Sequence, residues 1–446
     1  MHILLVSIGS HGDITPFLGL GVAMKQRGHK ATIVANPHFE TIVGREGLGF
    51  AAMGVHEDYE QLAQLFSTPQ PPLRTIPIIA RHFLLAMRSG YKRIEELHEK
   101  GETIVVGHIG AFATLLAKDR LRLPTITLLV NPTLLPSVYS PAKMSSLLLP
   151  PLPASIAKRV LPPLMRVVER ELAKAYVPEI NKYREDLGLG AISNFRDWLN
   201  SADILIGGWP EWLYGKQPDW PSNAITTEFL DYSPTPTLRE AQCCEDVVNM
   251  LNVQKPPIIF SIGSAMSQAA DYFEAAAESC SILSHPGILL TQHSEQIPTP
   301  LPRHVHHLSY APLAALASKA AAIVHHGGFG TASTTLRAGI PQLIVPMVFD
   351  QFDNAQRLSR LGVAKSISRK DVSARFMAKI LRQLVESRSI ADCCRYYSDK
   401  MRQTDPFHAT CQLAERLHHP SASDHFGVGV RSTGDTLDKT PSQRTL

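Results

Sequence analysis

The chain has 446 residues, 44% of them hydrophobic, so it is long enough for two or three domains with cores of their own. Its 44 lysines and arginines against 40 aspartates and glutamates give a net charge of +4, which is too small to indicate a nucleic-acid-binding protein. The six cysteines include no C-x-x-C motif, so neither a disulfide framework nor a zinc site is predicted. The amino terminus leads directly into a strand and a glycine loop, and no apolar run reaches the roughly 18 residues of a spanning helix. We therefore expect a soluble cytoplasmic protein, with a peripheral position at the inner face of the membrane as the alternative.

Short β-rich segments alternate with helical patterns along both halves of the chain. This alternation is typical of parallel sheets in an α/β fold. Strands are predicted at residues 3–7, 31–35, 103–106, 125–130 and 204–206, and then at 258–261, 287–290, 322–325 and 341–346.

An internal repeat indicates two similar domains. The tetrapeptide Ser-Ile-Gly-Ser closes the first strand of each half, at 7–10 and again at 261–264, each time before a loop and a helical pattern. The Ser-Pro-Thr-Pro stretch before residue 236 is typical of a linker. The predicted parts are a first domain at 1–235, a second domain at 236–400, a helix at 401–419, and a disordered tail at 420–446.

One segment of the first half is apolar and cationic together. No acidic residue lies between Arg120 and Val168, where leucine and proline dominate and the charged residues are basic. Two interpretations stay open. The segment is either a proline-rich excursion packed on its own domain, or a lip that faces lipid or a hydrophobic acceptor, where cations meet anionic headgroups.

The loop after the first strand carries a candidate carboxylate, Asp13. Thr15 followed by Pro16 is predicted to cap the next helix and form its first turn, so Asp13 is not needed as the cap. Asp13 would then lie at the carboxyl end of a strand, where open α/β sheets bind ligands. The alternative is that it stabilises the helix amino end through the macrodipole. His11 and Gly12 are candidates for lining the same pocket, although His11 is better explained as a solvated loop residue.

The strongest pattern in the chain is Ala-Ile-Val-His-His-Gly-Gly-Phe-Gly-Thr at residues 322–331. A β-branched strand leads into three glycines in four positions and then a helix, predicted to run from near Thr331 to Gly339. Free N–H groups at such a helix start suit a phosphate, with the Thr331 hydroxyl and the His326 ring as further donors. The motif lacks the Lys-Ser/Thr end of a P-loop and does not match the dinucleotide fingerprint. Tight strand-to-helix packing alone is the other interpretation of the glycines.

A second polar group follows the next buried strand. Asp350, Gln351, Asp353 and Asn354 are expected at the same edge of the sheet as the glycine loop. Carboxylates and amides can bond vicinal hydroxyl groups, so a sugar is the natural ligand. For Asp353, capping of the next helix is the alternative.

These motifs resemble the donor-binding signature of family 1 nucleotide-sugar glycosyltransferases of GT-B fold. Within that family the sequence is most similar to the group of bacterial sterol-glucosyltransferase-like, glycopeptide-antibiotic and rhamnosyltransferase B-subunit enzymes. The resemblance covers most of residues 1–419 and is most specific at 325–331 and 350–351. It implies two Rossmann-like domains whose parallel sheets face each other across a cleft. Residues 1–235 would then bind the acceptor and residues 236–400 the nucleotide sugar, and the helix at 401–419 would cross back to the first domain.

Carried over position by position, the resemblance assigns the donor diphosphate to one set of residues. His326 and the N–H groups of Gly328, Gly330 and Thr331 would hold it. Ser264 would reach it from the other side.

The resemblance also implies the remaining roles. Asp350 and Gln351 would hold the donor sugar, and Asp13 would be the general base. Tyr310 would stack on the donor base, and the Ala311 backbone would pair with its edge. Plant relatives have Trp followed by Pro-Gln in this region, whereas this chain reads Tyr-Ala-Pro-Leu, so uracil and thymine both stay open.

The function implied is that of an inverting, metal-independent glycosyltransferase without a cofactor. It would move a hexose or deoxyhexose from a UDP- or dTDP-sugar to a hydroxyl of a hydrophobic acceptor such as a sterol, a lipid or a polyketide-like compound. Peripheral membrane contact is an accompanying hypothesis, and no nucleic-acid partner is expected. Two alternatives remain, a nucleotide-sugar 2-epimerase and a noncatalytic nucleotide-sugar-binding protein.

Overall fold

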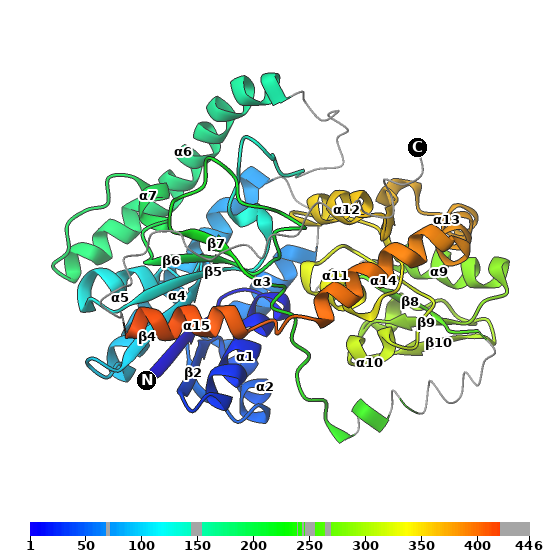
Figure 1. The fold of residues 1–446 in the computed structure, drawn as a ribbon, viewed down its shortest axis with the longest axis horizontal. Helices are drawn as coiled ribbons and strands as arrows, with labels where there is room; N and C mark the ends of the chain where they lie inside the picture. Colours follow the sequence, from blue (N-terminus) through cyan, green and yellow to red (C-terminus); the bar gives the residue numbers. More distant parts are fainter. Residues whose placement is uncertain are drawn as a thin grey trace. The chain divides into compact units, whose positions relative to one another are not determined.

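The computed structural model shows two compact α/β units, each built on a parallel sheet (Figure 1). The first unit comprises Met1–Ala142, Leu147–Thr235 and Asp405–His419, and the second is built on Pro236–Thr404. The residues that the structure describes are 1–67, 72–143, 154–238, 240–242, 245, 255–263 and 269–419.

The first unit contains a seven-stranded parallel sheet of order β3-β2-β1-β4-β5-β6-β7. Its strands are β1 (His2–Val6), β2 (Lys30–Ala35), β3 (Gly49–Ala52), β4 (Thr103–His108), β5 (Thr125–Leu129), β6 (Ile204–Gly207) and β7 (Ala224–Thr226). Its helices are α1 (His11–Gln26), α2 (Glu40–Arg45), α3 (His56–Ser67), α4 (Pro72–Leu97), α5 (Ala113–Leu121), α6 (Ala154–Asp186), α7 (Phe195–Leu199) and α15 (His408–His418).

The central strands of this sheet are buried on both faces, which explains their nearly continuous runs of β-branched and leucine residues. On one face, Phe17 and Leu20 of α1 pack in the same core as Phe407 and Cys411 of α15. Figure 1 shows α15, near the red end of the colour bar, beside α1, although the two helices come from opposite ends of the sequence. Residues 405–419 therefore complete the core of the first unit.

The second unit contains a six-stranded parallel sheet of order β10-β9-β8-β11-β12-β13. Its strands are β8 (Ile258–Ser261), β9 (Gly287–Leu290), β10 (Val305–Leu308), β11 (Ala322–His325), β12 (Gln342–Ile344) and β13 (Ala364–Ser366). Its helices are α9 (Ala270–Leu283), α10 (Leu313–Ala317), α11 (Phe329–Ala338), α12 (Gln351–Arg360), α13 (Ala374–Glu386) and α14 (Arg388–Arg402).

Helices cover both faces of the second sheet as well. Phe273 of α9 and Leu381 of α13 pack on one face around Phe260 and Val324. Leu316 of α10 belongs to a separate core on the other face. Each sheet is thus the middle layer of three, as the alternation of strands and helices predicts.

All nine strands predicted from the sequence are present, with ends that differ by at most two residues. The four strands that the prediction missed are β3, β7, β10 and β13, which are the edge strands of the two sheets. The predicted tail at 420–446 and part of the apolar cationic segment, 144–153, lie outside the described residues. Within the part of the chain that is described, no helix combines the length and the apolarity needed to cross a membrane.

Candidate functional site

Each sheet has one point where the strand order reverses. In the first unit β1 lies between β2 and β4, and in the second unit β8 lies between β9 and β11. The loops that leave two neighbouring strands at such a point diverge to opposite faces, and this opens a crevice at the carboxyl ends of the strands where α/β proteins bind ligands. The loops after β1 and β4, and those after β8 and β11, are therefore the candidate ligand-binding segments of the two units.

Asp13 lies in the first turn of α1, because the helix begins at His11 and not at the predicted position. Ser10 is the N-cap, and its N–H and hydroxyl groups both donate to Asp13 Oδ2, at 2.7 and 2.9 Å. The Ser10 hydroxyl in turn accepts a first-turn N–H, which completes a capping box. The prediction that Thr15 caps the helix is wrong, since Pro16 lies inside it, and Asp13 does take part in capping.

The other carboxylate oxygen of Asp13 faces His108, the last residue of β4. Asp13 Oδ1 and His108 Nε2 are 3.8 Å apart. Since His108 Nδ1 accepts the Gly110 N–H at 3.2 Å, a neutral ring carries its proton on Nε2, toward Asp13. Burial lowers the pKa of His108, and the Asp13 charge opposes that shift without reversing it. The side chain of Asp13 is 28% exposed and that of His108 8%, so Asp13 is the member of the pair open to a ligand.

His11 belongs to a cluster of rings near Asp13 and is not an isolated loop residue. Its Nδ1 lies 3.1 Å from the Tyr59 hydroxyl, and Tyr59 stacks on His38 with ring centroids 3.8 Å apart. Desolvation and the charge of His38 lower the pKa of His11 to about 4, while burial and the Asp13 charge raise the pKa of Tyr59. Gly12, also predicted for the pocket, is exposed and donates its N–H to the N-cap hydroxyl. The rings, called the aromatic cluster below, are His11, His38, Phe39, His56 and Tyr59.

The glycine loop of the second unit follows β11 and leads into α11. Gly328 is the N-cap and offers no side-chain acceptor, so the amide end of the helix has no side-chain cap. The helix begins at Phe329, two residues before the predicted start, which puts Gly330 and Thr331 in its first turn. An uncapped helix start of this kind presents N–H donors and the positive end of the helix dipole.

His326 packs between the two loops of this switch point. A Cβ atom at Gly328 would lie 2.5 Å from its Nε2, and one at Gly263, in the loop after β8, would lie 2.8 Å from its Cε1. Its Nδ1 is buried and has no hydrogen-bond partner among the described residues. Burial, and to a smaller extent His325, lowers the pKa of His326 to about 3, so the ring is neutral. The two glycines thus make room for a neutral, polar ring beside the helix start.

His325 is a residue of this site that the sequence analysis did not single out. It is fully buried at the end of β11, where Nε2 donates to Gln342 Oε1 at 2.9 Å and Nδ1 accepts the Gly327 N–H at 3.1 Å. Burial lowers its pKa to about 4. His325 therefore fixes the backbone at the start of the glycine loop, and its tautomer is set by both partners.

Asp350 is tied to the glycine loop through Asn354. The Asn354 amide donates to Asp350 Oδ2 at 2.8 Å and to the Gly327 carbonyl at 2.9 Å. Phe349, just before Asp350, has a φ of 51°, an unfavourable backbone angle for a bulky residue that sets the direction in which Asp350 leaves the loop. The predicted sugar-binding carboxylate and the predicted phosphate loop are thus brought together.

Gln351 has a more local partner. Its side-chain carbonyl accepts the N–H groups of Met347 and Val348 at 2.8 and 3.0 Å. The side-chain amide N–H groups of Gln351 are therefore the donors that it can direct to a ligand. Asp353 is buried in the first turn of α12 and forms a 2.6 Å ion pair with Arg357, so its role is structural.

Two further predicted residues, Tyr310 and Ala311, lie at the edge of the second sheet where its strands end. Tyr310 and Ala311 follow β10, and Tyr310 is 54% exposed whereas Ala311 is buried. Ser264 lies outside the described residues, directly after Gly263. Among the residues whose placement is described, no three His, Cys, Asp or Glu side chains gather as a metal site would require.

Comparisons with known proteins find similarity to glycosyltransferases. Residues 286–412 match the family model described as "Erythromycin biosynthesis protein CIII-like, C-terminal domain". The chain is 28% identical over 386 residues to O-mycaminosyltylonolide 6-deoxyallosyltransferase of Streptomyces fradiae, covering 82% of this chain and 85% of that protein. It is 26% identical over 390 residues to sterol 3-beta-glucosyltransferase of Emericella nidulans, covering 84% of this chain but 27% of that longer protein.

Solved structures share the fold at lower identity. The glycosyltransferase VinC in complex with DTDP superposes with a TM-score of 0.65 at 18% identity, over 94% of this chain and 99% of that one. The predicted fold class, a GT-B arrangement of two parallel-sheet α/β domains, is confirmed. The matched family model, the similar relatives and the shared fold together support a family 1 glycosyltransferase of GT-B fold.

Proposed function

We propose that the protein transfers a hexose or deoxyhexose from a UDP- or dTDP-sugar to a hydroxyl group of a hydrophobic acceptor, with inversion at the anomeric carbon. The observation that carries this proposal is the uncapped start of α11 with the neutral His326 ring packed against it, which together suit a diphosphate. A dTDP-type donor is supported by the similar structure in complex with DTDP. The acceptor class is supported by relatives named for a sterol and for O-mycaminosyltylonolide.

In the proposed reaction Asp13 is the general base. Its Oδ2 is held by the Ser10 N–H and hydroxyl, while Oδ1 is left to accept the proton of the acceptor hydroxyl. A carboxylate is a weak base for an alcohol, so the proton moves late, as the attacking oxygen becomes acidic in the transition state. The His108 Nε2 lies 3.8 Å from the same oxygen, beyond hydrogen-bond distance, and the dipole of its N–H favours a negative charge there. The aromatic cluster offers ring faces for an apolar acceptor.

The leaving diphosphate carries negative charge that the protein must stabilise. The N–H groups of Gly328, Gly330 and Thr331 and the ring of His326 would bind it, with Ser264 as a further donor. These groups are fixed before the reaction and meet the negative charge as it develops, which is the task a divalent cation has in other transferases. We therefore propose that transfer needs neither a metal ion nor a cofactor.

Other residues are candidates for binding the sugar and the base of the donor. Asp350 and the Gln351 amide would bond the sugar hydroxyls. Exposed Tyr310 would stack on the pyrimidine, and the Ala311 backbone would pair with its edge.

A donor panel followed by an acceptor panel tests the proposal. Thermal shift with UDP- and dTDP-sugars identifies the donor, and release of the nucleoside diphosphate is then followed with sterols, hydroxylated lipids and polyketide aglycones. Release that depends on the acceptor supports the transferase. Conversion of the sugar by enzyme and donor alone would support a 2-epimerase, and tight donor binding without turnover would support a noncatalytic binding protein.

The phosphate site has a test of its own. His326→Ala should weaken donor binding in calorimetry, because one donor to the diphosphate is lost. Gly190→Ala is the matched control, since a Cβ at this loop position meets open space. Unchanged donor affinity in His326→Ala would contradict the assignment of this ring to the diphosphate.

A further inference from the structure

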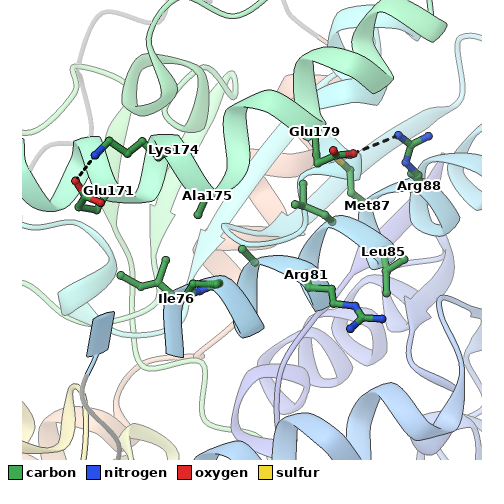
Figure 2. A pocket seen from close by; sticks show the side chains of 12 residues that line it. Ile76, Arg81, Leu85, Met87, Arg88, Glu171, Lys174, Ala175 and Glu179 are labelled. Carbon is green, nitrogen blue, oxygen red and sulfur yellow. Dashed lines mark hydrogen bonds and ion pairs between the residues drawn. The ribbon is translucent and has the colours of Figure 1, made fainter. Parts of the chain in front are cut away.

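An open groove runs between α4 and α6 of the first unit, and neither Asp13 nor His108 lines it. Its cavity volume is about 520 Å³. Apolar and charged side chains both line it, and Figure 2 shows Ile76 and Arg81 of α4 opposite Lys174 and Ala175 of α6. The wall from α6 uses Glu171, Ala175 and Glu179, which are four residues apart and so share one face of the helix.

The same face of α6 continues toward its amino end as an apolar stripe that is open to solvent. Val160, Leu164, Val167 and Val168 follow each other at the spacing of one helix face. They are 49%, 56%, 58% and 49% exposed. Single exposed hydrophobic residues are common, but four large ones in line on a helix mark an interaction surface. We call these four residues the α6 stripe.

A row of arginines runs beside the α6 stripe. Arg159, Arg166 and Arg170 each precede a residue of the groove-and-stripe face by one position, so they form a line along one flank of it. All three are exposed, and none has an ion-pair partner within the described residues. The two acidic residues nearby, Glu169 and Glu171, are each paired with another basic side chain. The surface is therefore apolar along its centre and positively charged along its flank.

We infer that the α6 stripe and its arginine row dock the protein on an anionic lipid bilayer. A helix lying in the interface places its apolar face among the upper acyl chains and its basic residues at the headgroups, and this surface has both features on adjacent faces. A second copy of the protein fits less well, because the arginine row would meet no unpaired acidic residue next to the stripe.

Vesicle sedimentation with the full chain tests the inference without any sugar donor or acceptor, so its outcome is independent of the transfer reaction. We expect binding to vesicles of phosphatidylcholine with phosphatidylglycerol, weaker binding at high salt, and little binding to phosphatidylcholine alone. Arg166→Ala with Arg170→Ala should lower the partition coefficient on the order of 25-fold, at about fivefold for each arginine near an anionic surface. Leu164→Glu with Val167→Glu should abolish binding, because it puts charge into the apolar face.

A matched control comes from the second unit. Ile282 on α9 is 47% exposed, so Ile282→Glu makes the same kind of change on a helix without an arginine row, and it should leave vesicle binding as in the wild type. Circular dichroism checks that all variants fold. Absence of binding to anionic vesicles, or equal binding by the wild type and both α6 variants, would overturn the inference. A dimer in sedimentation that the α6 variants convert to monomer, without vesicle binding, would overturn it in favour of self-association.

Discussion

Asp13, in the first turn of α1, and His108, at the end of β4, lie together at the switch point of the first sheet, with Oδ1 and Nε2 3.8 Å apart. The two carboxylate oxygens of Asp13 have different tasks, because Oδ2 is held by the helix cap and Oδ1 faces His108. A capping role and a catalytic role are thus compatible in one residue. Substitutions that keep one role and remove the other can separate them.

Asp13→Asn removes the negative charge but keeps an oxygen that can accept the Ser10 N–H. We expect turnover to fall on the order of 10²-fold or more, as for the loss of a general base, while donor affinity and the unfolding midpoint stay near the wild type. Steady-state kinetics at saturating donor, donor calorimetry and thermal unfolding measure the three quantities. Turnover close to the wild-type value would rule out Asp13 as the base.

Asp13→Ala should lower both the stability of the protein and its turnover. The cap loses its partner, which costs about 1 kcal/mol of unfolding free energy, and turnover falls as in the Asn variant. A variant that loses stability but keeps turnover would mean that Asp13 acts only as a helix cap.

His108→Phe keeps a flat ring of similar size and removes both nitrogens. The Gly110 N–H loses its acceptor, so the free energy of unfolding should fall by about 1–2 kcal/mol. If the dipole of the His108 N–H supports the carboxylate across this 3.8 Å distance, kcat should also fall at unchanged acceptor KM, by less than the roughly tenfold that a full hydrogen bond accounts for. His108→Gln, which keeps an N–H dipole on the side chain, should recover part of kcat. A loss of stability with unchanged kcat in the Phe variant would mean that His108 is only structural.

The sequence allowed the strands to be predicted where burial shapes their composition. Central strands such as β1 and β11 are covered on both faces and consist of apolar runs. The edge strands lack such runs: β13 reads Ala-Lys-Ser and β10 reads Val-His-His-Leu. Each has one neighbouring strand and more exposed surface, so its hydrophobic pattern is weak and its pairing is set by the rest of the sheet.

Site residues could be predicted from the sequence where their pattern is local, and not where distant segments meet only in the fold. The glycine loop and Asp350 could be predicted because their pattern lies within one short stretch of sequence. The start of α1 was misjudged because Thr15-Pro16 fits a helix start, whereas Ser10 and Asp13 satisfy two backbone groups reciprocally and so determine the actual one. His108 is far from Asp13 in sequence, and only the adjacency of β1 and β4 brings the two together.

Gly328→Ala tests whether the donor site needs the His326 ring in its present place. The added Cβ would lie 2.5 Å from His326 Nε2, so the ring must move. We expect donor affinity to fall roughly tenfold to a hundredfold, because a hydrogen bond to a charged group contributes about 1.5–3 kcal/mol. Calorimetry with the donor measures this, and Gly190→Ala, where the Cβ meets open space, should bind as the wild type does. Equal affinities in the two variants would contradict the proposed site.

The buried His325 makes stability depend on pH. Burial lowers its pKa from 6.5 to about 4, so between these values the unfolded chain binds a proton that the native protein does not. The free energy of unfolding should therefore rise with pH through this window, with a contribution from this group of up to about 1.4 kcal/mol per pH unit, and level off above 6.5. His325→Gln removes the titrating ring but keeps an amide that can bond Gln342, so the slope should flatten by about that amount. Urea unfolding of both proteins across the window measures the slopes, and equal slopes would mean that His325 is not held neutral.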